Sequence, residues 1–542
     1  MNCLHVDFEY DDDTKRWTCQ RCDQDLRDTP VDARPMVEVD TGELAQQADQ
    51  TWEALSAWSM KHDDPVVLVK DGVLVRATER DLEEYDRYSL REEASRAGMY
   101  ARTNRQGQTR VYPPNEIMDS LLRRDPRDYT GAPRVTSVVD VPIVSGMGDL
   151  ITEPGIHSSG VYYRPAKGLG LINHEEIEVD TVDAVRSARN LLMDELLGDF
   201  DFANESSRVN ALGLVLLPFL RAFIGENPTP LHIVDANQAG SGKSFLTQAC
   251  LIPGCGLVGF APEPRDEDEL RKLITSSLLS GRSAVVFDNV NERLASGTLA
   301  SVLTSRVWQD RILGQSKEVS LPVRCIWVTT GNHYNATGEL VDRICPIELE
   351  APKGEQVARR RGADAFRHPD LHGWALEHRR ELVVACLTLV HHWLLGAAKR
   401  DFEGGFVRIG GLHQSDATLG SFERWAEVIG GVLAAADVRG FLGNLDDARL
   451  KMDSEEQETR EFLLAWRERL GDVPTTSDSL AMACQLGGPL ANMLPSGINT
   501  RTLVQSIRYW LRQHNGQRHG RLILRRVDGD GRAALWTVEE TQ

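Results

Sequence analysis

The sequence lacks the features of secreted and membrane proteins. It has nine cysteines in 542 residues, an odd and dispersed set that does not form a disulfide framework, so we expect a reducing compartment, the cytoplasm. Its most apolar run, residues 211–220, is too short to span a bilayer and contains Pro218, so no membrane contact is expected. The N-terminal residues are acidic, unlike a signal peptide.

The chain also lacks positive charge. Asp and Glu number 81 against 61 Lys and Arg, and the formal net charge is −20. Such a balance excludes non-specific nucleic-acid binding over the whole surface, so any contact with DNA has to come from local basic patches. Hydrophobic residues make up 41% of the chain, enough for the cores of about two to four domains.

The clearest chemistry is in residues 231–250, LHIVDANQAGSGKSFLTQAC, which predict a buried parallel strand, a glycine loop and a helix. Backbone N–H groups at a helix N-terminus bind polyphosphates, and the helix dipole favours their charge. Gly240 and Gly242 allow the backbone to approach the phosphates. Lys243 would reach the β- and γ-phosphates, and the Ser244 hydroxyl would bind Mg²⁺.

The loop differs from the pattern GxxxxGK[ST] at one position, where Asn237 replaces the first glycine. Asn tolerates the left-handed backbone better than most residues, so the ATP-binding interpretation stands. The alternative is a chance glycine-rich turn. The predicted ATP-binding residues are Asn237, Gln238, Ala239, Gly240, Ser241, Gly242, Lys243 and Ser244.

A second strand, within residues 281–290, ends in Asp288, which would hold Mg²⁺ together with Ser244. A strand-end turn residue is the alternative. The next residue is Asn289, and an amide cannot accept the proton of the attacking water. A carboxylate would then have to come from elsewhere, and the candidates are Glu263, Glu269 and Glu292.

Residues 306–333 predict a hairpin with its tip at 314–317, followed by a buried strand that ends in Thr330 and Asn332. A polar side chain at that strand end can contact the γ-phosphate or the attacking water. Arg343 lies just before another short strand, where it can reach the γ-phosphate of a neighbouring subunit. Its alternative role is a surface ion pair.

The ordered set GSGKS, AVVFDN, DRILG, VTTGN and VDR resembles the AAA+ ATPases of phage, prophage and plasmid replication proteins. These are similar to superfamily 3 helicases and to the helicase halves of phage primase–helicases. The resemblance covers residues 205–445, and residues 142–165 resemble the segment that precedes the ATPase in such proteins. It implies ATP and Mg²⁺, a ring of subunits that is a hexamer, and a basic residue on the hairpin that tracks DNA. The implied roles are Walker A for Lys243 and Ser244, Walker B for Asp288, sensor 1 for Asn332, arginine finger for Arg343 and DNA tracking for Lys317.

The first residues predict a zinc module. A C-x-H pair and a C-x-x-C pair, Cys3 with His5 and Cys19 with Cys22, suit a tetrahedral structural Zn²⁺. An unstructured tail with free thiols is the alternative. The acidic run at 11–13 is expected to be solvated. No pair of carboxylates suited to a primase is visible, so a separate primase is an expected partner.

The last ninety residues predict three helices and a hairpin, the order of a winged helix whose third helix enters the major groove. Residues 501–542 contain eight arginines against four acidic residues, a local basic patch in an acidic chain. We predict DNA contacts at Arg501, Arg508 and Arg512; a protein-docking winged helix is the alternative.

The predicted fold class is a multidomain α/β chain. Its expected parts are a zinc-binding module (1–27), a linker (28–50), an α+β accessory domain (51–200), an AAA+ core (201–352), a helical lid (353–450) and a winged helix (451–542). The leading hypothesis is an ATP-driven DNA helicase or translocase of a mobile element. The alternatives are an initiator or helicase loader that uses ATP as an assembly switch, and an ATPase regulator that binds duplex DNA.

Overall fold

The structure is a computed structural model of the 542-residue chain. Two units divide the chain: Met1–Pro142 with Ile151–Leu171, and Ile143–Leu150 with Ile172–Gln542. The residues that the structure describes are 8–11, 16–19, 34–39, 43–62, 64–78, 82–104, 107–177, 181–236, 240–262, 264, 266–290, 296–311, 318–331, 338–350, 366–396, 399–403, 406–410, 417–485, 487–491, 493–495, 498–519, 521–527 and 534–540.

The first unit mixes helices with small sheets. Its three-stranded sheets are β3 (Met36–Glu38), β7 (Met99–Asn104) and β8 (Gly107–Val111); β4 (Leu68–Lys70), β5 (Val73–Ala77) and β6 (Leu82–Glu84); and β9 (Ser137–Val139), β12 (Gly155–Ile156) and β13 (Val161–Tyr163). A two-stranded sheet pairs β1 (Phe8–Asp11) with β2 (Arg16–Cys19). Its main helices are α1 (Leu44–Ser59), α2 (Arg87–Ala97) and α3 (Asn115–Leu122). The Asp-Gly pair between residues 65–70 and 73–78 predicts a hairpin turn, and the structure confirms it: Asp71 and Gly72, between β4 and β5, both have positive φ, 48° and 86°.

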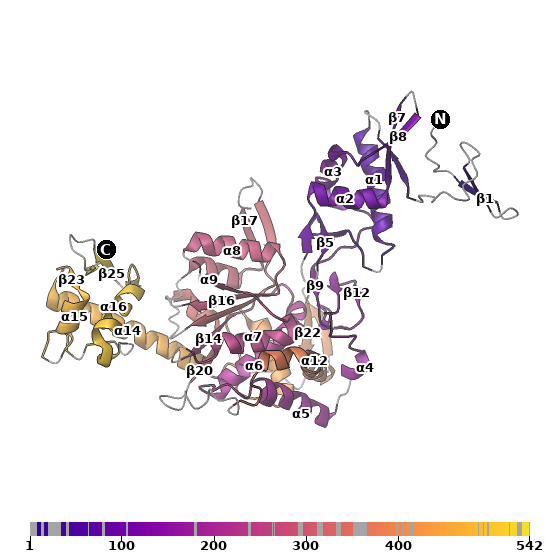
Figure 1. The fold of residues 1–542 in the computed structure, drawn as a ribbon. Helices are drawn as coiled ribbons and strands as arrows, with labels where there is room; N and C mark the ends of the chain where they lie inside the picture. Colours follow the sequence, from indigo (N-terminus) through magenta and orange to yellow (C-terminus); the bar gives the residue numbers. More distant parts are fainter. Residues whose placement is uncertain are drawn as a thin grey trace. The chain divides into compact units, whose positions relative to one another are not determined.

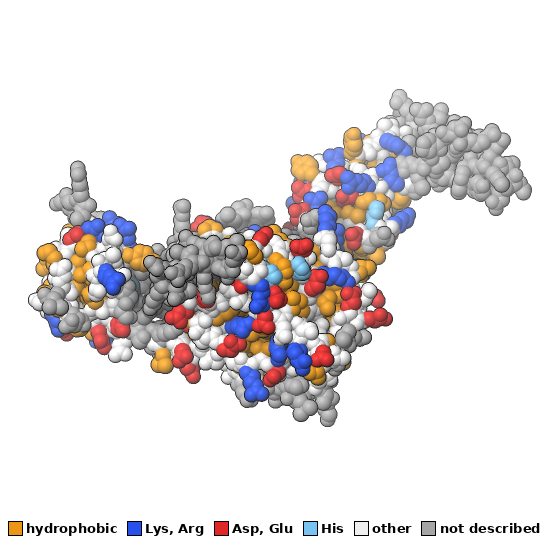
Figure 2. All heavy atoms as spheres, turned by 60° about the horizontal axis from the view of Figure 1, so that its bottom comes forward, with side chains coloured by type: hydrophobic (Ala, Val, Ile, Leu, Met, Phe, Trp, Pro, Cys, Tyr) orange, Lys and Arg blue, Asp and Glu red, His pale blue; other side chains and the backbone are white. Residues whose placement is uncertain are grey.

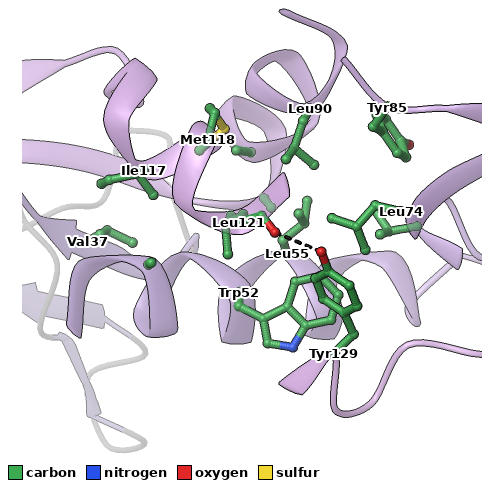
Figure 3. Close-up of a cluster of buried hydrophobic side chains, with 14 of the residues drawn as sticks. Val37, Trp52, Leu55, Leu74, Tyr85, Leu90, Ile117, Met118, Leu121 and Tyr129 are labelled. Carbon is green, nitrogen blue, oxygen red and sulfur yellow. Dashed lines mark hydrogen bonds between the residues drawn. The ribbon is translucent and has the colours of Figure 1, made fainter. Parts of the chain in front are cut away.

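The core of this unit is formed by side chains from all three helices and the adjoining strands (Figure 3). Trp52 and Tyr129 pack against each other with their rings tilted by 52° and the ring centroids 5.1 Å apart. The Trp52 indole donates a hydrogen bond to the Thr130 carbonyl (3.0 Å), and the Tyr129 hydroxyl donates one to the Leu121 carbonyl (2.8 Å). Both rings are therefore buried with their polar atoms satisfied.

The second unit is built on a five-stranded parallel sheet in the order β15-β16-β19-β14-β20. A parallel sheet is covered on both faces, and most side chains of its strands are accordingly apolar. Figure 1 shows α6 and α7 on one side of this sheet and α8 and α9 on the other. The strands are β14 (Leu231–Ala236), β15 (Phe260–Pro262), β16 (Ala284–Val290), β19 (Ile326–Gly331) and β20 (Ile344–Leu349); the helices are α6 (Glu205–Ile224), α7 (Lys243–Cys255), α8 (Glu267–Leu279) and α9 (Gly297–Thr304).

Helix α6 is the most apolar segment of the chain. Among the described residues, it is the one helix that by length and composition could cross a membrane. However, 83% of its apolar stretch is buried inside the fold. It begins at an Asn204 cap, whose side chain accepts from the backbone N–H of Ser207 (2.8 Å). Its apolar side chains are therefore part of the core of this unit.

Where α6 packs against α7, no room is left for an additional methyl group. A Cβ built on Gly254 would lie 2.7 Å from Cγ of Pro218, and the proline ring cannot rotate away. We expect Gly254→Ala to lower the free energy of unfolding by about 1–2 kcal/mol, because overpacking outweighs the better helix propensity of alanine. Urea unfolding measures this. Gly259→Ala, where a Cβ meets nothing within 4 Å, is the control, and equal stability of the two variants would contradict the prediction.

A helical layer adjoins the sheet. It consists of α5 (Val182–Asn190), a π-helix (Leu191–Leu196), α11 (Leu371–Glu377), α12 (Arg379–Gly396) and α13 (Glu423–Ala435). Helix α12 contacts α5, α6, α7 and α13, so it is a central element of this layer.

The chain ends in a small helical and β structure. The long helix α14 (Leu445–Leu470) leads into β23 (Thr475–Thr476), α15 (Ser477–Ala483), α16 (Leu503–Gln513), β24 (Arg518–His519), β25 (Leu522–Val527) and β26 (Leu535–Glu540). The sheet order is β23-β26-β25-β24. Phe462 and Trp466 of α14 are fully buried together with Ile507 and Leu511 of α16.

Candidate nucleotide-binding site

The glycine loop joins β14 to α7 at the carboxyl edge of the parallel sheet. Gly240 and Gly242 have φ of 78° and 90°, and Gly242 is the N-cap of α7. Only glycine adopts such angles without strain, so the sequence at these positions follows from the backbone path. Lys243 is the first residue of the helix and is 8% exposed. The predicted ATP-binding residues 237–239 lie outside the described residues.

Ser244 and Asp288 meet as the sequence predicted. The Ser244 hydroxyl donates to Oδ1 of Asp288 at 2.7 Å. The two residues are brought together because α7 starts, and β16 ends, at the same edge of the sheet. A hydroxyl and a carboxylate are ligands that Mg²⁺ prefers, so this pair fits the metal expected there.

Thr330 completes this arrangement from β19, the strand between β14 and β16. Its hydroxyl donates to the same Oδ1 of Asp288 (2.7 Å) and accepts from the backbone N–H of Asn289 (2.8 Å). From the sequence, Thr330 was a polar strand end that could contact the γ-phosphate or the attacking water; its hydrogen bond to Asp288 was not predicted. Its role is to orient the carboxylate and to hold the residue that follows it.

Asn289 has a left-handed backbone, with φ of 55°, at an irregularity in the β16–β19 pairing. Asn is one of the few residues with a side chain that adopts this region readily. The position therefore suits a small polar residue and not a long carboxylic acid. Among the other candidates for activating water, Glu269 is exposed on α8 and pairs with Lys272 at 2.7 Å, and Glu263 and Glu292 lie outside the described residues.

The Lys243 ammonium is held in a partly desolvated, acidic environment. Burial lowers the pKa of Lys243, and the charges of Asp235 and Asp288 oppose that shift. The lysine therefore has two carboxylates as charged neighbours, at the end of the glycine loop.

Aromatic side chains surround the start of α7. The His372 ring stacks on Phe245 with centroids 3.8 Å apart, and its Nε2 lies 2.9 Å from the Phe245 carbonyl oxygen. Phe200 lies 6.2 Å from Phe245, and a Cβ on Gly242 would be 3.8 Å from its ring. These rings form an aromatic cluster next to the glycine loop, with Phe200 tilted by 49° against Phe245.

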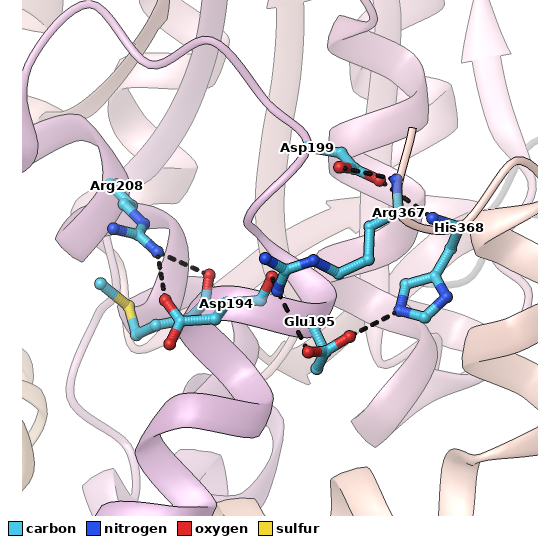
Figure 4. Close-up of polar contacts among 7 residues, drawn as sticks. Asp194, Glu195, Asp199, Arg208, Arg367 and His368 are labelled. Atoms are coloured by element: carbon cyan, nitrogen blue, oxygen red, sulfur yellow. Dashed lines mark hydrogen bonds and ion pairs between the residues drawn. The ribbon is translucent and has the colours of Figure 1, made fainter. Parts of the chain in front are cut away.

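A polar cluster joins the two segments that carry these rings (Figure 4). The Asp199 carboxylate accepts from the backbone N–H groups of Arg367 (3.1 Å) and His368 (3.2 Å). The His368 ring hydrogen-bonds Glu195 (2.9 Å), and Arg367 pairs with the same carboxylate (3.1 Å). The cluster ties the chain before Phe200 to the chain before His372.

Arg343 lies at the end of a 3-10 helix, Gly338–Arg343, before β20. Its guanidinium donates to the carbonyl oxygen of Ala300 in α9 of the same chain and is only partly exposed. The structure therefore gives Arg343 a contact inside its own chain. Asn332 and Lys317, the other residues predicted in this region, lie outside the described residues.

For the adjacent Arg379 and Arg380, the sequence favours a surface position over contact with the nucleotide, and for Arg379 the surface prediction is wrong. Its side chain is 7% exposed and its Nε donates to the carbonyls of Ile252 (2.9 Å) and Pro253 (3.2 Å) at the end of α7. A cation at a helix C-terminus satisfies unpaired carbonyls and complements the dipole. Arg380 pairs with Glu176 through both carboxylate oxygens, at 2.9 and 2.7 Å.

The zinc prediction lies outside the part of the chain whose side chains are described. Cys3, His5 and Cys22 are not described, and Cys19 is described only as part of a strand, β2 (Arg16–Cys19). Within the described residues, no group of three or more His, Cys, Asp or Glu is placed to hold a metal. Zinc therefore stays a prediction.

The arginines predicted to contact DNA differ in their surroundings: Arg508 and Arg512 lie on α16, and Arg501 lies on the preceding 3-10 helix, Thr500–Thr502. Arg508 is held by both oxygens of Asp478 (3.1 and 2.9 Å) and by Ser477 (3.1 Å), which attaches α16 to the start of α15. Arg501 and Arg512 are exposed, and among the described residues no carboxylate lies within ion-pair distance of either. On the face shown in Figure 2, acidic and basic side chains are interspersed, in keeping with an acidic chain whose basic sites are local.

The threonine between the two strands gives a prediction with a matched control. We expect Thr330→Val to lower the apparent affinity for Mg²⁺ in ATP turnover about 10- to 100-fold, because Asp288 loses an orienting donor. Turnover measured against Mg²⁺ concentration tests this. The control is Thr329→Val: Thr329 is also buried, but its hydroxyl has no hydrogen-bond partner among the described residues. Equal Mg²⁺ dependence in both variants would remove the role given to Thr330.

No protein-family model matches the chain. No curated protein matches it. Among solved structures, it is similar to the X-ray structure of JCV helicase, at 18% identity and a TM-score of 0.20 over 40% of this chain and 63% of that one. Two further JCV helicase structures, one bound to a thiazolopyridine acetamide and one to an inhibitor, match at 18% and 15% identity, TM-scores of 0.20 and 0.19, and 40% of this chain.

The chain spans less than two thirds of the length of these helicase structures, 63 to 64%. With TM-scores of 0.19 to 0.20, its function has to be inferred from its own residues.

Proposed function

We propose that this chain is an ATPase of the AAA+ class that moves or unwinds DNA as a ring oligomer. The observation that carries the ATPase proposal is the convergence of Ser244, Asp288 and Thr330 at the N-terminus of α7. Two strands, β16 and β19, and one helix, α7, deliver these groups to one edge of the sheet. A hydroxyl, a carboxylate and a buried lysine next to a glycine loop are the groups that a nucleoside triphosphate and its metal require.

In this proposal the residues have separate tasks. The loop N–H groups and Lys243 bind the phosphates, and Phe245 with Phe200 contacts the base. Ser244 and Asp288 hold Mg²⁺, which neutralises phosphate charge when it is bound. Thr330 keeps Asp288 in place.

The motor proposal rests on the hairpin and on the C-terminal structure. Strands β17 (Val307–Arg311) and β18 (Glu318–Pro322) form an antiparallel hairpin whose connecting segment contains Lys317, the proposed DNA contact. The order α14, β23, α15, α16, β25, β26 supports a winged helix with α16 as the helix that contacts duplex DNA. A ring, a hexamer by the resemblance of the sequence, would place Arg343 of one subunit at the loop of the next. The setting in replication of a phage, prophage or plasmid-type element is part of the same proposal.

The test is ATP turnover with and without single-stranded DNA, together with strand displacement on a forked duplex. We expect stimulation by DNA and unwinding. ATP binding with slow turnover that DNA does not change would overturn the motor and favour the second candidate.

That second candidate is an initiator or helicase loader in which ATP is an assembly switch. It is favoured by one observation, the left-handed Asn289 at the position where a water-activating carboxylate would stand. Slow hydrolysis suits a switch. ATP-dependent assembly without unwinding would support it.

The duplex contact of α16 can be tested by its salt dependence. We expect Arg512→Ala to weaken duplex binding and to reduce the slope of log affinity against log salt by about 1, because one phosphate contact is lost. Titrations at several salt concentrations measure this. The control is Arg439→Ala, whose side chain is 91% exposed and lies outside α16. An unchanged slope in Arg512→Ala would favour a protein partner for this surface.

A further inference from the structure

Strand β17 of the β17–β18 hairpin is fixed to α8 by a polar network. The Asp310 carboxylate accepts from Arg271 (2.8 Å) and from the hydroxyl of Thr275, both on α8. The Trp308 indole donates to the same hydroxyl at 2.9 Å. Thr275 and Trp308 are 5% and 8% exposed. Figure 1 shows β17 beside α8.

The Asp310 carboxylate holds this attachment in its charged form. Burial acts to raise the pKa of Asp310, but the hydrogen bonds from Thr275 and Arg271 outweigh it, so the pKa lies below its ordinary value. The carboxylate is therefore ionised at neutral pH and accepts a charge-assisted bond from Arg271. A hairpin held in this way moves together with α8.

Helix α8 is in turn connected to α9. Glu267, its first residue, accepts from the backbone N–H of Thr298 in the first turn of α9 (3.1 Å). The carbonyl of Ala300, also in α9, accepts from the Arg343 guanidinium. The contacts run without a break from the hairpin through α8 and α9 to Arg343.

We propose that Asp310 and Glu267 are positioning residues that couple the hairpin to Arg343 through α8 and α9. The inference rests on the proposed function, in which the hairpin contacts DNA and Arg343 serves the nucleotide of the neighbouring subunit. A displacement of the hairpin by DNA then moves the arginine that completes the next site. This gives a physical basis for stimulation of ATP turnover by DNA.

The first experiment compares DNA stimulation of ATP turnover in Asp310→Asn, Thr275→Val and Glu267→Gln. We expect a loss of stimulation of about 2- to 30-fold, with turnover in the absence of DNA changed much less. The control is Lys272→Ala, an exposed α8 residue that pairs with Glu269. Full stimulation in both Asp310→Asn and Glu267→Gln would overturn the proposal.

The second experiment needs neither DNA nor nucleotide. Hydrogen exchange of the full chain is measured in residues 297–304 and 307–311. We expect Asp310→Asn to raise exchange in α9 as well as in β17, and Lys272→Ala to raise neither. If DNA does not stimulate turnover of the wild-type chain but Asp310→Asn raises exchange in α9, the motor proposal is wrong and the link between the hairpin and α9 stands. If exchange rises only in β17, the link is overturned.

Discussion

Replacement of Lys243 by alanine is expected to reduce ATP turnover about 100- to 1,000-fold, the cost of removing one preorganised charged donor from a reacting phosphate. The lysine is the first residue of α7, is 8% exposed and has Asp235 and Asp288 as charged neighbours. No other lysine or arginine of the described loop, residues 240–244, can substitute for it.

The measurement is steady-state turnover, together with the rise in melting temperature on addition of ATP. Ligand binding stabilises the folded state by mass action, so a variant that no longer binds loses the rise. Lys272→Ala on exposed α8 controls for loss of a positive charge. Unchanged turnover in Lys243→Ala would mean that the glycine loop is not the nucleotide site.

Removal of Arg343 is expected to leave ATP binding almost intact and to lower turnover about 10³- to 10⁵-fold, the range associated with arginine fingers. The separation of binding from turnover follows from position, because the arginine would act on the neighbouring subunit and not on its own loop. In its own chain, Arg343 contacts the Ala300 carbonyl.

A mixing experiment distinguishes action in trans from support of α9. Arg343→Ala supplies an intact loop and Lys243→Ala supplies an intact arginine, so mixed rings are expected to recover turnover that neither variant has alone. Arg343→Lys keeps a donor for Ala300 but not the guanidinium fork, and should keep the melting temperature without restoring turnover. Absence of recovery on mixing would return Arg343 to a structural role.

Much of the nucleotide site could be read from local sequence. The glycine loop and the strand ending in Asp288 were predicted, and their meeting follows from a general property of parallel sheets, whose carboxyl ends share one edge. The hydrogen bond between Ser244 and Asp288 has the geometry that this property implies.

Other features depend on residues far apart in the sequence. Arg379 binds carbonyls 126 and 127 positions earlier, and no local pattern distinguishes such a buried cap from a surface arginine. The stacking of His372 on Phe245 likewise depends on the packing of the helical layer against α7. So does the hydrogen bond that the Asp199 carboxylate accepts from a backbone N–H far along the chain. Arg508, expected on a DNA-facing surface, is held by Asp478 of another helix.

By itself the sequence determined the glycine loop, the pair proposed to bind the metal and the apolar strands that carry them, because these depend on spacing within short segments. Only the tertiary structure decided which strand lies between β14 and β16, and so which hydroxyl orients Asp288. Strand order is set by the packing of whole helices across the sheet, and that packing energy is spread over many side chains that no single motif records.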